Sequence, residues 1–267
     1  MALVDVGDIH LDCERSGSGP PLLLIMGMSG TALTWGEPFL RELRRDFEVI
    51  VYDHRGVGAS SRLEGPITTA ELAADAAALL AALELDSVHV LGISMGGMVA
   101  QELALAHPER VRTLALGCTY CGGPRSVRTG EEQRRRIVQA QSAGDRELAL
   151  RTSWELNVSS SFASDEQQYS EFAARALRRR VAVAVILQQA RAVLAHDTSA
   201  RLSQLSAPTL ILHGTEDQLL PLANAQLMAE LVPHARVEIF DGVGHLFFLE
   251  RPQRSAALLR EHAAVHA

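Results

Sequence analysis

The chain has 267 residues, a formal net charge of -7 and 47% hydrophobic residues. This length predicts one large α/β domain with a substantial core rather than two independent domains. The acidic balance argues against a nucleic-acid partner, and the absence of lysine excludes a Schiff-base cofactor, a phosphate-binding lysine and a Ser-Lys dyad.

Short apolar runs alternate with longer amphipathic stretches, a pattern typical of a mostly parallel sheet covered by helices. The chain opens with two short runs, at 3–6 and 9–14, that predict an antiparallel hairpin. Six further strands are predicted at 21–26, 47–52, 88–92, 112–117, 209–213 and 236–240. Helices are predicted at 69–85, 95–106 and 222–231 and from residue 252 onward. The expected fold class is α/β, with a mostly parallel eight-stranded sheet and helices on both of its faces.

Residues from about 124 to 200 interrupt this alternation. They contain helix-like stretches at 131–143, 145–156, 165–180 and 181–194 and no strand-like run. We expect a helical cap, or lid, inserted after the sixth strand, with residues 1–123 and 201–267 forming the core and 124–200 the cap. A lid of this kind would exclude water and shape a pocket. A separate helical domain is the alternative, but a segment that leaves and rejoins one sheet is more simply a cap.

The segment Gly92-Ile93-Ser94-Met95-Gly96 lies between a predicted strand and a predicted helix. As a bare pattern G-x-S-x-G is common, but this context is that of a nucleophile elbow. A sharp strand-to-helix turn exposes the serine hydroxyl, and the small glycines let the strand and the helix approach closely. Ser94 is therefore predicted to be a nucleophile.

A serine nucleophile needs a base within hydrogen-bond reach, and the base needs a partner that fixes its tautomer. Asp217 follows the predicted strand at 209–213, and His245 follows the last predicted strand. The chain order serine, aspartate, histidine is the one found in hydrolases of the elbow type. All three residues lie at carboxyl ends of predicted strands, where open parallel sheets place their sites. Three other residues compete for the acid and base roles: Glu216, His213 and His54.

These residues, together with two further motifs, resemble the α/β-hydrolase superfamily over nearly the whole chain. The motifs are Asp53-His-Arg-Gly-Val-Gly-Ala-Ser60 and Gly244-His-Leu-Phe-Phe-Leu-Glu-Arg-Pro252. The similarity points to the lid-bearing group that includes esterases, lactonases, carbon–carbon-bond hydrolases and cofactor-free haloperoxidases. The first motif is interpreted as a structural turn, in which an arginine and an aspartate brace loops near the site.

The resemblance also implies an oxyanion hole formed by two backbone N–H groups. One belongs to Met95, directly after the nucleophile, and the other to Met28, in the loop after the third strand. Many relatives have His-Gly before the second of these residues, whereas this chain has Met26-Gly27. Because backbone groups bind the oxyanion, we expect the hole to be retained, although the loop loses a polar side chain.

The pocket around Ser94 is expected to be apolar if at least two nearby methionines face it, because methionine fills irregular apolar space. The candidates are Met26, Met28, Met95 and Met98. Aromatic residues could extend this surface, namely Trp35, Trp154 and Phe162. A charged anchor for the substrate could come from Arg125 or Arg191.

The predicted function is that of a serine hydrolase that cleaves a carboxylic ester or lactone of a small, largely apolar substrate through an acyl-enzyme intermediate. Carbon–carbon-bond hydrolysis and cofactor-free haloperoxidase or perhydrolase chemistry use the same three residues and stay open as alternatives. A ligand receptor on this fold is disfavoured. Some such receptors have lost one of the three residues, whereas this chain has Ser94, Asp217 and His245. Serine at the elbow argues against dehalogenase and epoxide-hydrolase activity, which use aspartate there.

Nothing at the start of the chain marks it for secretion. The longest apolar runs are far shorter than the ~20 residues that a membrane helix requires. An odd number of cysteines does not form a disulfide framework, so a soluble, cytoplasmic protein is expected. Cys118 and Cys121 form a C-x-x-C that is interpreted as two packed thiols, and neither a metal nor a cofactor is expected. The sequence indicates a small-molecule substrate but no oligomeric state.

Overall fold

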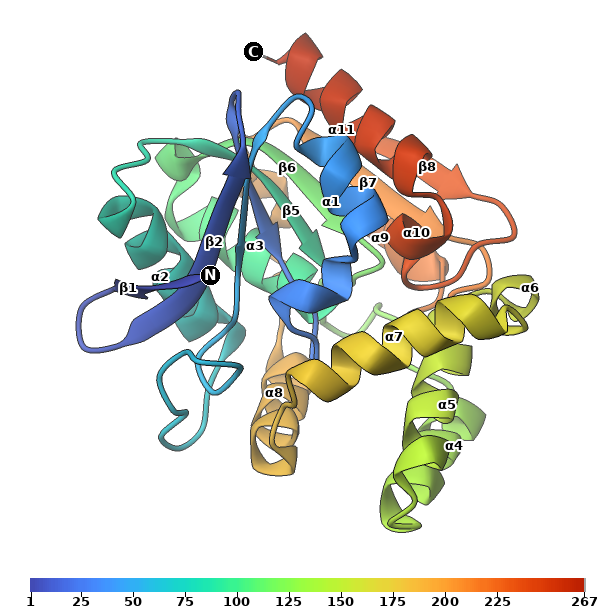
Figure 1. Ribbon diagram of the computed structural model, residues 1–267. Helices are drawn as coiled ribbons and strands as arrows, with labels where there is room; N and C mark the ends of the chain where they lie inside the picture. The colour runs from blue at the N-terminus through green and yellow to red at the C-terminus, as the bar shows by residue number, and fades with distance from the viewer. Residues whose placement is uncertain (267) are drawn as a thin grey trace.

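A single mixed sheet organises the computed structural model, which describes residues 1–266 (Figure 1). Within these residues eight strands pair in the order β1-β2-β4-β3-β5-β6-β7-β8. The strands are β1 (Ala2–Asp5), β2 (His10–Gly17), β3 (Pro21–Ile25), β4 (Glu48–Tyr52), β5 (Val88–Ile93), β6 (Val111–Gly117), β7 (Thr209–Gly214) and β8 (Arg236–Phe240). The β1–β2 and β2–β4 pairs are antiparallel and the other pairs are parallel. The predicted fold class is confirmed.

Helices cover both faces of the sheet. One face carries α2 (Thr69–Ala82), α3 (Met95–Ala106) and α9 (Ala223–Leu231), and the other carries α1 (Glu37–Leu43) and α11 (Pro252–Val265) (Figure 1). Alternate residues of β3 serve the two cores, because successive strand side chains point to opposite faces. Leu23 packs in the core under α2, α3 and α9, whereas Leu22 and Leu24 pack under α1 and α11. Burial on both faces explains why the inner strands are continuous apolar runs.

Six short elements escaped the sequence analysis. They are η1 (Ala32–Trp35) and α1 after β3, η2 (Pro108–Arg110) before β6, α6 (Ser160–Ala163), η3 (Leu202–Gln204) before β7, and α10 (Phe247–Glu250) before α11. Each spans at most seven residues. A hydrophobic periodicity needs a longer window to be recognised, so elements of this length are not readable from the pattern. Thr31 caps the start of η1, because its side chain accepts a hydrogen bond from the Leu33 N–H.

Five α-helices lie between β6 and β7, at the edge of the sheet where the parallel strands end (Figure 1). They are α4 (Glu131–Ser142), α5 (Arg146–Asn157), α6, α7 (Glu166–Arg178) and α8 (Val183–Ala195). Residues 124–200 are called the inserted segment below. Aspartate and serine side chains cap several of these helices, as at Asp145 for α5 and Asp165 for α7. Trp154, Val158 and Tyr169 form a small core of the inserted segment.

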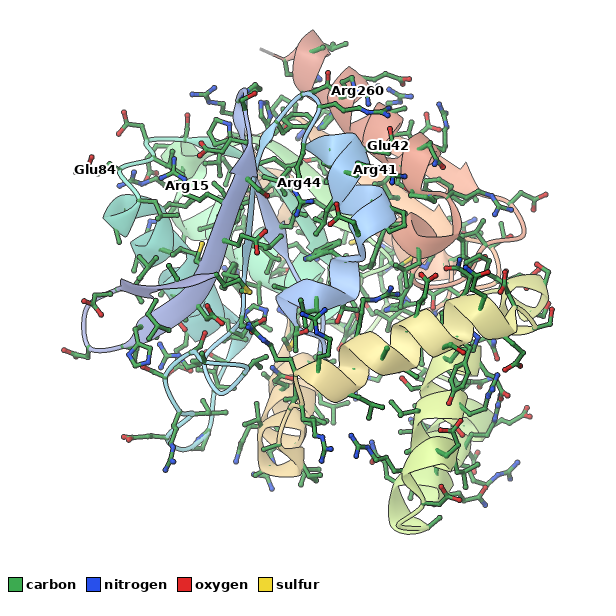
Figure 2. All side chains as sticks on the ribbon, in the orientation of Figure 1. Arg15, Arg41, Glu42, Arg44, Glu84 and Arg260 are labelled. Atoms are coloured by element: carbon green, nitrogen blue, oxygen red, sulfur yellow. The ribbon has the colours of Figure 1, made fainter. Side chains whose placement is uncertain are left out.

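Surface arginines are largely engaged with carboxylates. Figure 2 shows Arg44 and Arg260 around α1 and α11, away from the inserted segment. Arg44 pairs with Glu37 at 2.8 Å, and Arg260 pairs with Asp46 at 2.6 Å. Such exposed pairs each contribute about 1 kcal/mol or less to stability.

None of the helices in residues 1–266 combines the length and the apolar character that crossing a bilayer would require.

The turn from β5 into α3 depends on two glycines that have no room for a side chain. A Cβ at Gly92 would lie 2.2 Å from the Gly96 carbonyl oxygen, and a Cβ at Gly96 would lie 2.0 Å from the Ile25 carbonyl oxygen. Both contacts are with backbone, which cannot move aside as a flexible side chain can. The glycines of the G-x-S-x-G motif therefore allow α3 to approach β5 and β3 closely.

A Gly96→Ala variant is expected to lose at least about 1 to 3 kcal/mol of unfolding free energy, because the added methyl overpacks a rigid backbone contact. Urea denaturation of purified protein measures this loss. Gly130→Ala is the matched control, since its φ of -59° is ordinary and the added Cβ would meet only the Gln133 side chain. Equal stability of the two variants would contradict the close-approach explanation.

Candidate active site

Ser94 lies at the tip of the turn between β5 and α3. Its φ of 56° and ψ of -123° are a strained conformation for a residue with a side chain, as expected at a nucleophile elbow. Backbone hydrogen bonds hold it there: the Ser94 N–H donates to the Gly117 carbonyl at 2.9 Å. The Thr119 hydroxyl donates to the Ser94 carbonyl at 2.7 Å. The Ser94 side chain is partly exposed, whereas its neighbours in the turn are buried.

Asp217 and His245 are in direct contact. His245 Nδ1 lies 2.8 Å from Asp217 Oδ2, and both side chains are buried. The other carboxylate oxygen, Oδ1, accepts hydrogen bonds from the N–H groups of Leu219 and Leu220, each at 2.9 Å. Because Nδ1–H donates to the carboxylate, the neutral imidazole has Nε2 as its acceptor. Asp217, in the loop after β7, thus orients His245, in the loop between β8 and α10.

The environment of Asp217 favours its ionised form. Burial by itself raises the pKa of this carboxyl, but the charge of His245 and the hydrogen bonds from His213 and His245 outweigh burial and hold the pKa well below its usual range. The carboxylate is therefore charged throughout the neutral pH range. A charged, positioned carboxylate stabilises an imidazolium next to it.

The three competing residues have other roles. His213 Nε2 lies 2.7 Å from the Leu220 carbonyl and 3.2 Å from Asp217 Oδ2, so this imidazole supports Asp217 from within the core. His54 is buried with Nε2 at 3.0 Å from the Met26 carbonyl. Glu216 accepts hydrogen bonds from the N–H and the hydroxyl of Ser160, at 2.9 and 3.0 Å, in the inserted segment. None of the three lines the cavity that contains Ser94.

Ser94 and His245 line one cavity of about 380 Å³, which lies between the core and the inserted segment. Residues 1–266 contain no hydrogen bond between the Ser94 hydroxyl and His245. Bonds between a nucleophile and its base are often long before substrate binds and tighten in the complex. The structure thus brings Asp217 and His245 together and places Ser94 in the same cavity as His245.

The cavity is mainly apolar. Met26, Met28, Ile93, Leu150, Phe172 and Leu246 line it, so two methionines face it as expected. Met95 and Met98 do not: their side chains are fully buried in the core. The expectation that the Met95 side chain borders the pocket is wrong. Met95 begins α3, and this helix turns its first side chain toward the sheet.

Two further expectations about the pocket are wrong. The aromatic residues Trp35, Trp154 and Phe162 pack in hydrophobic clusters and do not line the cavity. Arg125 pairs with Glu230 on the surface, and Arg191 is exposed. The arginines that line the cavity are Arg179 and Arg180, which follow α7.

The loop after β3 passes directly beside Ser94. A Cβ on Gly27 would lie 3.0 Å from the Ser94 Cβ and 3.6 Å from its hydroxyl oxygen. Met28 follows in this loop, and Met95 begins α3, where a first-turn N–H has no acceptor within its helix. Within residues 1–266 neither the Met28 nor the Met95 N–H is the donor of a backbone–backbone hydrogen bond outside regular elements. Met95 thus directly follows Ser94, and Met28 lines the same cavity as Ser94.

Cys118, Asp217 and His245 offer ligand atoms that lie within 4.8 Å of one another. A metal would require a Cys118 thiolate, whereas burial raises the pKa of this thiol well above its usual value. The Asp217 and His245 atoms also bond to each other. We therefore interpret Cys118 as a buried thiol that packs beside the Asp217–His245 pair, and not as a metal ligand. Cys118 and Cys121 are both free and buried.

Two residues of the inserted segment that contact the core escaped the sequence analysis. Arg179 Nη1 contacts Asp12 Oδ2 at 2.7 Å and also contacts Asp53. The Gln189 side-chain oxygen accepts a hydrogen bond from the Ser29 N–H at 2.9 Å. No local motif contains either residue, since their partners are more than 100 residues away in the chain. Asp53 braces the loop after β3 by accepting a hydrogen bond from the Ala32 N–H at 2.7 Å, as the interpretation of its motif implied.

The sheet order, the strand-to-helix serine turn and the position of the cavity define the protein as an α/β hydrolase. The family model described as alpha/beta hydrolase fold matches residues 20–252, so the chain belongs to this family. It is 33% identical to a putative carbamate hydrolase of Azorhizobium caulinodans over 246 residues, 92% of each chain. It is 28% identical to 3-oxoadipate enol-lactonase 2 of Acinetobacter baylyi, over 92% of this chain and 90% of that one. A thermophilic esterase of Thermogutta terrifontis has a similar structure, with a TM-score of 0.78 and 27% identity over 97% of this chain and 95% of that one.

Proposed function

We propose that the protein is a serine hydrolase that cleaves a carboxylic ester or lactone of a small, largely apolar substrate through an acyl-enzyme intermediate. The observation that carries the proposal is the shared cavity of Ser94 and His245, with His245 Nδ1 held by Asp217 at 2.8 Å. The names of the relatives support it, because an enol-lactonase and an esterase both cleave an acyl–oxygen bond.

The proposed reaction begins when His245 Nε2 accepts the Ser94 proton and Ser94 Oγ attacks the substrate carbonyl carbon. The carbonyl oxygen becomes negatively charged and accepts hydrogen bonds from the Met28 and Met95 N–H groups. Asp217 stabilises the imidazolium. The tetrahedral intermediate then collapses, the acyl–oxygen bond breaks, and the leaving alkoxide takes the proton from His245. Water, deprotonated by His245, hydrolyses the acyl-enzyme in the same way and regenerates Ser94.

The lining of the cavity supports the proposed substrate class. Its apolar side chains suit a small hydrocarbon acyl or alcohol group, and about 380 Å³ lies at the lower end of the usual range for ligand pockets. The inserted segment supplies part of this lining, including Leu150 and Phe172. We propose that it acts as the lid of the site, which excludes water from the acyl-enzyme and selects the substrate.

Trapping the acyl-enzyme tests the proposal. Wild-type protein quenched in acid during turnover of a slowly deacylating p-nitrophenyl ester is expected to gain the mass of one acyl group, on the peptide that contains Ser94. Ser94→Ala is expected to gain none. Ser153→Ala is the matched control, because Ser153 lines the same cavity, and it is expected to be acylated like the wild type. An acyl group on Ser94→Ala would contradict the proposal.

A substrate panel separates the alternative reactions. Esters, lactones and thioesters of graded acyl size are compared with a vinylogous diketone and with halide plus hydrogen peroxide. Preference for esters or lactones supports the proposal, preference for the diketone indicates carbon–carbon-bond hydrolysis, and dominant halogenation indicates a perhydrolase. Tight binding without product release would indicate a receptor.

A further inference from the structure

The loop that carries Met28 has little internal support. Its sequence, Met26-Gly27-Met28-Ser29-Gly30, contains two glycines, and Ser29 has a positive φ of 60°. The internal hydrogen bond of its turn, from the Gly30 N–H to the Gly27 carbonyl, is long at 3.3 Å. A glycine-rich turn with a strained residue has alternative conformations of similar energy. An external contact is therefore needed to select one conformation of this loop.

Gln189 supplies such a contact from helix α8 of the inserted segment. Its side-chain oxygen accepts a hydrogen bond from the Ser29 N–H at 2.9 Å, and its side chain is only 2% exposed. Ser29 directly follows Met28, so this bond orients the Met28–Ser29 peptide and restrains the ψ torsion of Met28, next to the Met28 N–H. The Gln189 Nε2 has no hydrogen-bond partner in residues 1–266. A buried amide with an unpaired nitrogen costs stability, so packing alone does not favour glutamine at this position.

The C-terminal end of the loop is also tied to the inserted segment. The Ala32 N–H donates to Asp53 Oδ1 at 2.7 Å, and Asp53 Oδ2 bonds to Arg179, which directly follows α7. The Asp53 side chain is fully buried, so it depends on Arg179 to compensate its charge. Residues of the inserted segment therefore support the loop at two positions after Met28, directly at Ser29 and through Asp53 at Ala32.

We propose that Gln189 is a positioning residue that couples the inserted segment to the oxyanion hole. With α8 docked, Gln189 holds the Ser29 N–H, and the Met28 N–H is directed at the oxygen on which charge develops. With α8 displaced, the loop loses this constraint and the hole loses one oriented donor. The inserted segment thus completes the catalytic geometry when it closes over the substrate. This inference rests on the proposed serine hydrolase function.

Three variants test the coupling. Gln189→Met keeps the length of the side chain and removes the acceptor oxygen, whereas Gln189→Glu keeps an acceptor oxygen at the same place. Gln188→Met is the matched control, because the neighbouring Gln188 points to Arg191 and does not line the cavity. The measurements are kcat and KM for a p-nitrophenyl ester and the inhibition constant of a trifluoromethyl ketone, whose adduct with serine carries an oxyanion.

Gln189→Met is expected to lower kcat by about 10- to 100-fold, part of the roughly 10²- to 10³-fold loss caused by removing an oxyanion donor outright. KM should change by less than about 3-fold, and inhibitor affinity should fall by about the same factor as kcat, because both report the oxyanion. Gln189→Glu is expected to restore kcat by at least half of the logarithmic loss, so that a 100-fold decrease becomes at most about 10-fold. Gln188→Met is expected to have the kcat of the wild type. If Gln189→Met does not fold, Gln189→Asn, which withdraws the amide by one methylene, takes its place.

Unchanged kcat and inhibitor affinity in folded Gln189→Met would overturn the inference. So would a loss confined to KM, or an equal loss in Gln188→Met. Ser94→Ala is run in parallel. If Ser94→Ala retains activity, the proposed serine hydrolase function is wrong. If Ser94→Ala is inactive but Gln189→Met is fully active, only the proposed role of Gln189 is wrong.

Discussion

The Ser94→Ala variant is expected to hydrolyse an activated ester about 10⁴- to 10⁶-fold more slowly than the wild type in kcat, because the acyl-enzyme pathway has no other nucleophile. The fold should be unaffected, since the strained backbone at Ser94 is held by bonds from its N–H and to its carbonyl, which alanine retains. KM should change little, as the hydroxyl contributes to the transition state rather than to binding. Steady-state kinetics with p-nitrophenyl acetate and butyrate measure the effect.

The control for this variant is Ser153→Ala, which removes a hydroxyl from the same cavity and is expected to stay within about 3-fold of wild-type kcat. Comparable activity of Ser94→Ala and the wild type would contradict the covalent mechanism. Loss of activity in both variants would instead show that the substitutions disturb the cavity. The assay therefore separates nucleophilic catalysis from a general effect on substrate binding.

Asp217→Asn is expected to lower kcat by about 10⁴-fold, although asparagine has nearly the same shape. The Leu219 and Leu220 N–H groups bond to Oδ1 and require an acceptor there, so the asparagine amide nitrogen must take the place of Oδ2. That nitrogen donates to His245 Nδ1 and drives the proton to Nε2. An imidazole protonated at Nε2 cannot accept the Ser94 proton.

The same substitution is expected to destabilise the protein in a pH-dependent manner. The folded-state pKa of Asp217 lies below its ordinary value, so the carboxylate contributes stability that is fully present above about pH 4, the unfolded-state value, and is lost as the pH falls through the folded pKa. The difference in unfolding free energy between the wild type and Asp217→Asn should therefore be largest near pH 7 and shrink at pH 3. Urea denaturation at both pH values measures it.

Glu216→Gln provides the control for both effects. Glu216 is adjacent in the chain but bonds to Ser160 rather than to His245. We expect it to retain kcat within about 5-fold of the wild type. A loss in Glu216→Gln as large as that in Asp217→Asn, or a stability difference for Asp217→Asn that does not change with pH, would contradict the assignment of Asp217 as the partner of His245.

The local motifs predicted much of the candidate site. Ser94 was identified because two glycines and a strand-to-helix change surround it, and these are properties of neighbouring residues. Asp217 and His245 were identified because each follows an apolar strand, and carboxyl ends of parallel strands share one edge of the sheet. In the structure Asp217 and His245 are in contact, and His245 shares the cavity of Ser94. The rivals also lie at strand ends, His54 just after β4 and His213 near the end of β7, so position along the chain did not separate them from His245.

The sequence predicted less well which way individual side chains point. Met95 and Met98 were both candidates for the pocket lining, yet both are buried in the core. A residue at the start of a helix can face the sheet or the pocket, and the rotation of α3 about its axis depends on its packing against β3, β5 and β6. Trp154 illustrates the same point, because it packs against Tyr169 and Phe172 within the inserted segment and not toward Ser94.

The sequence by itself determined the α/β class, the strands, the long helices and the candidates Ser94, Asp217 and His245, because periodicity and turn chemistry act over a few residues. Only the tertiary structure decided which histidine meets Asp217, which side chains line the cavity, and that Gln189 and Arg179 support the loop of Met28. The contacts of Gln189 and Arg179 join residues more than 100 positions apart. They arise when the inserted segment packs on the core, and no local pattern encodes the partners that such packing brings together.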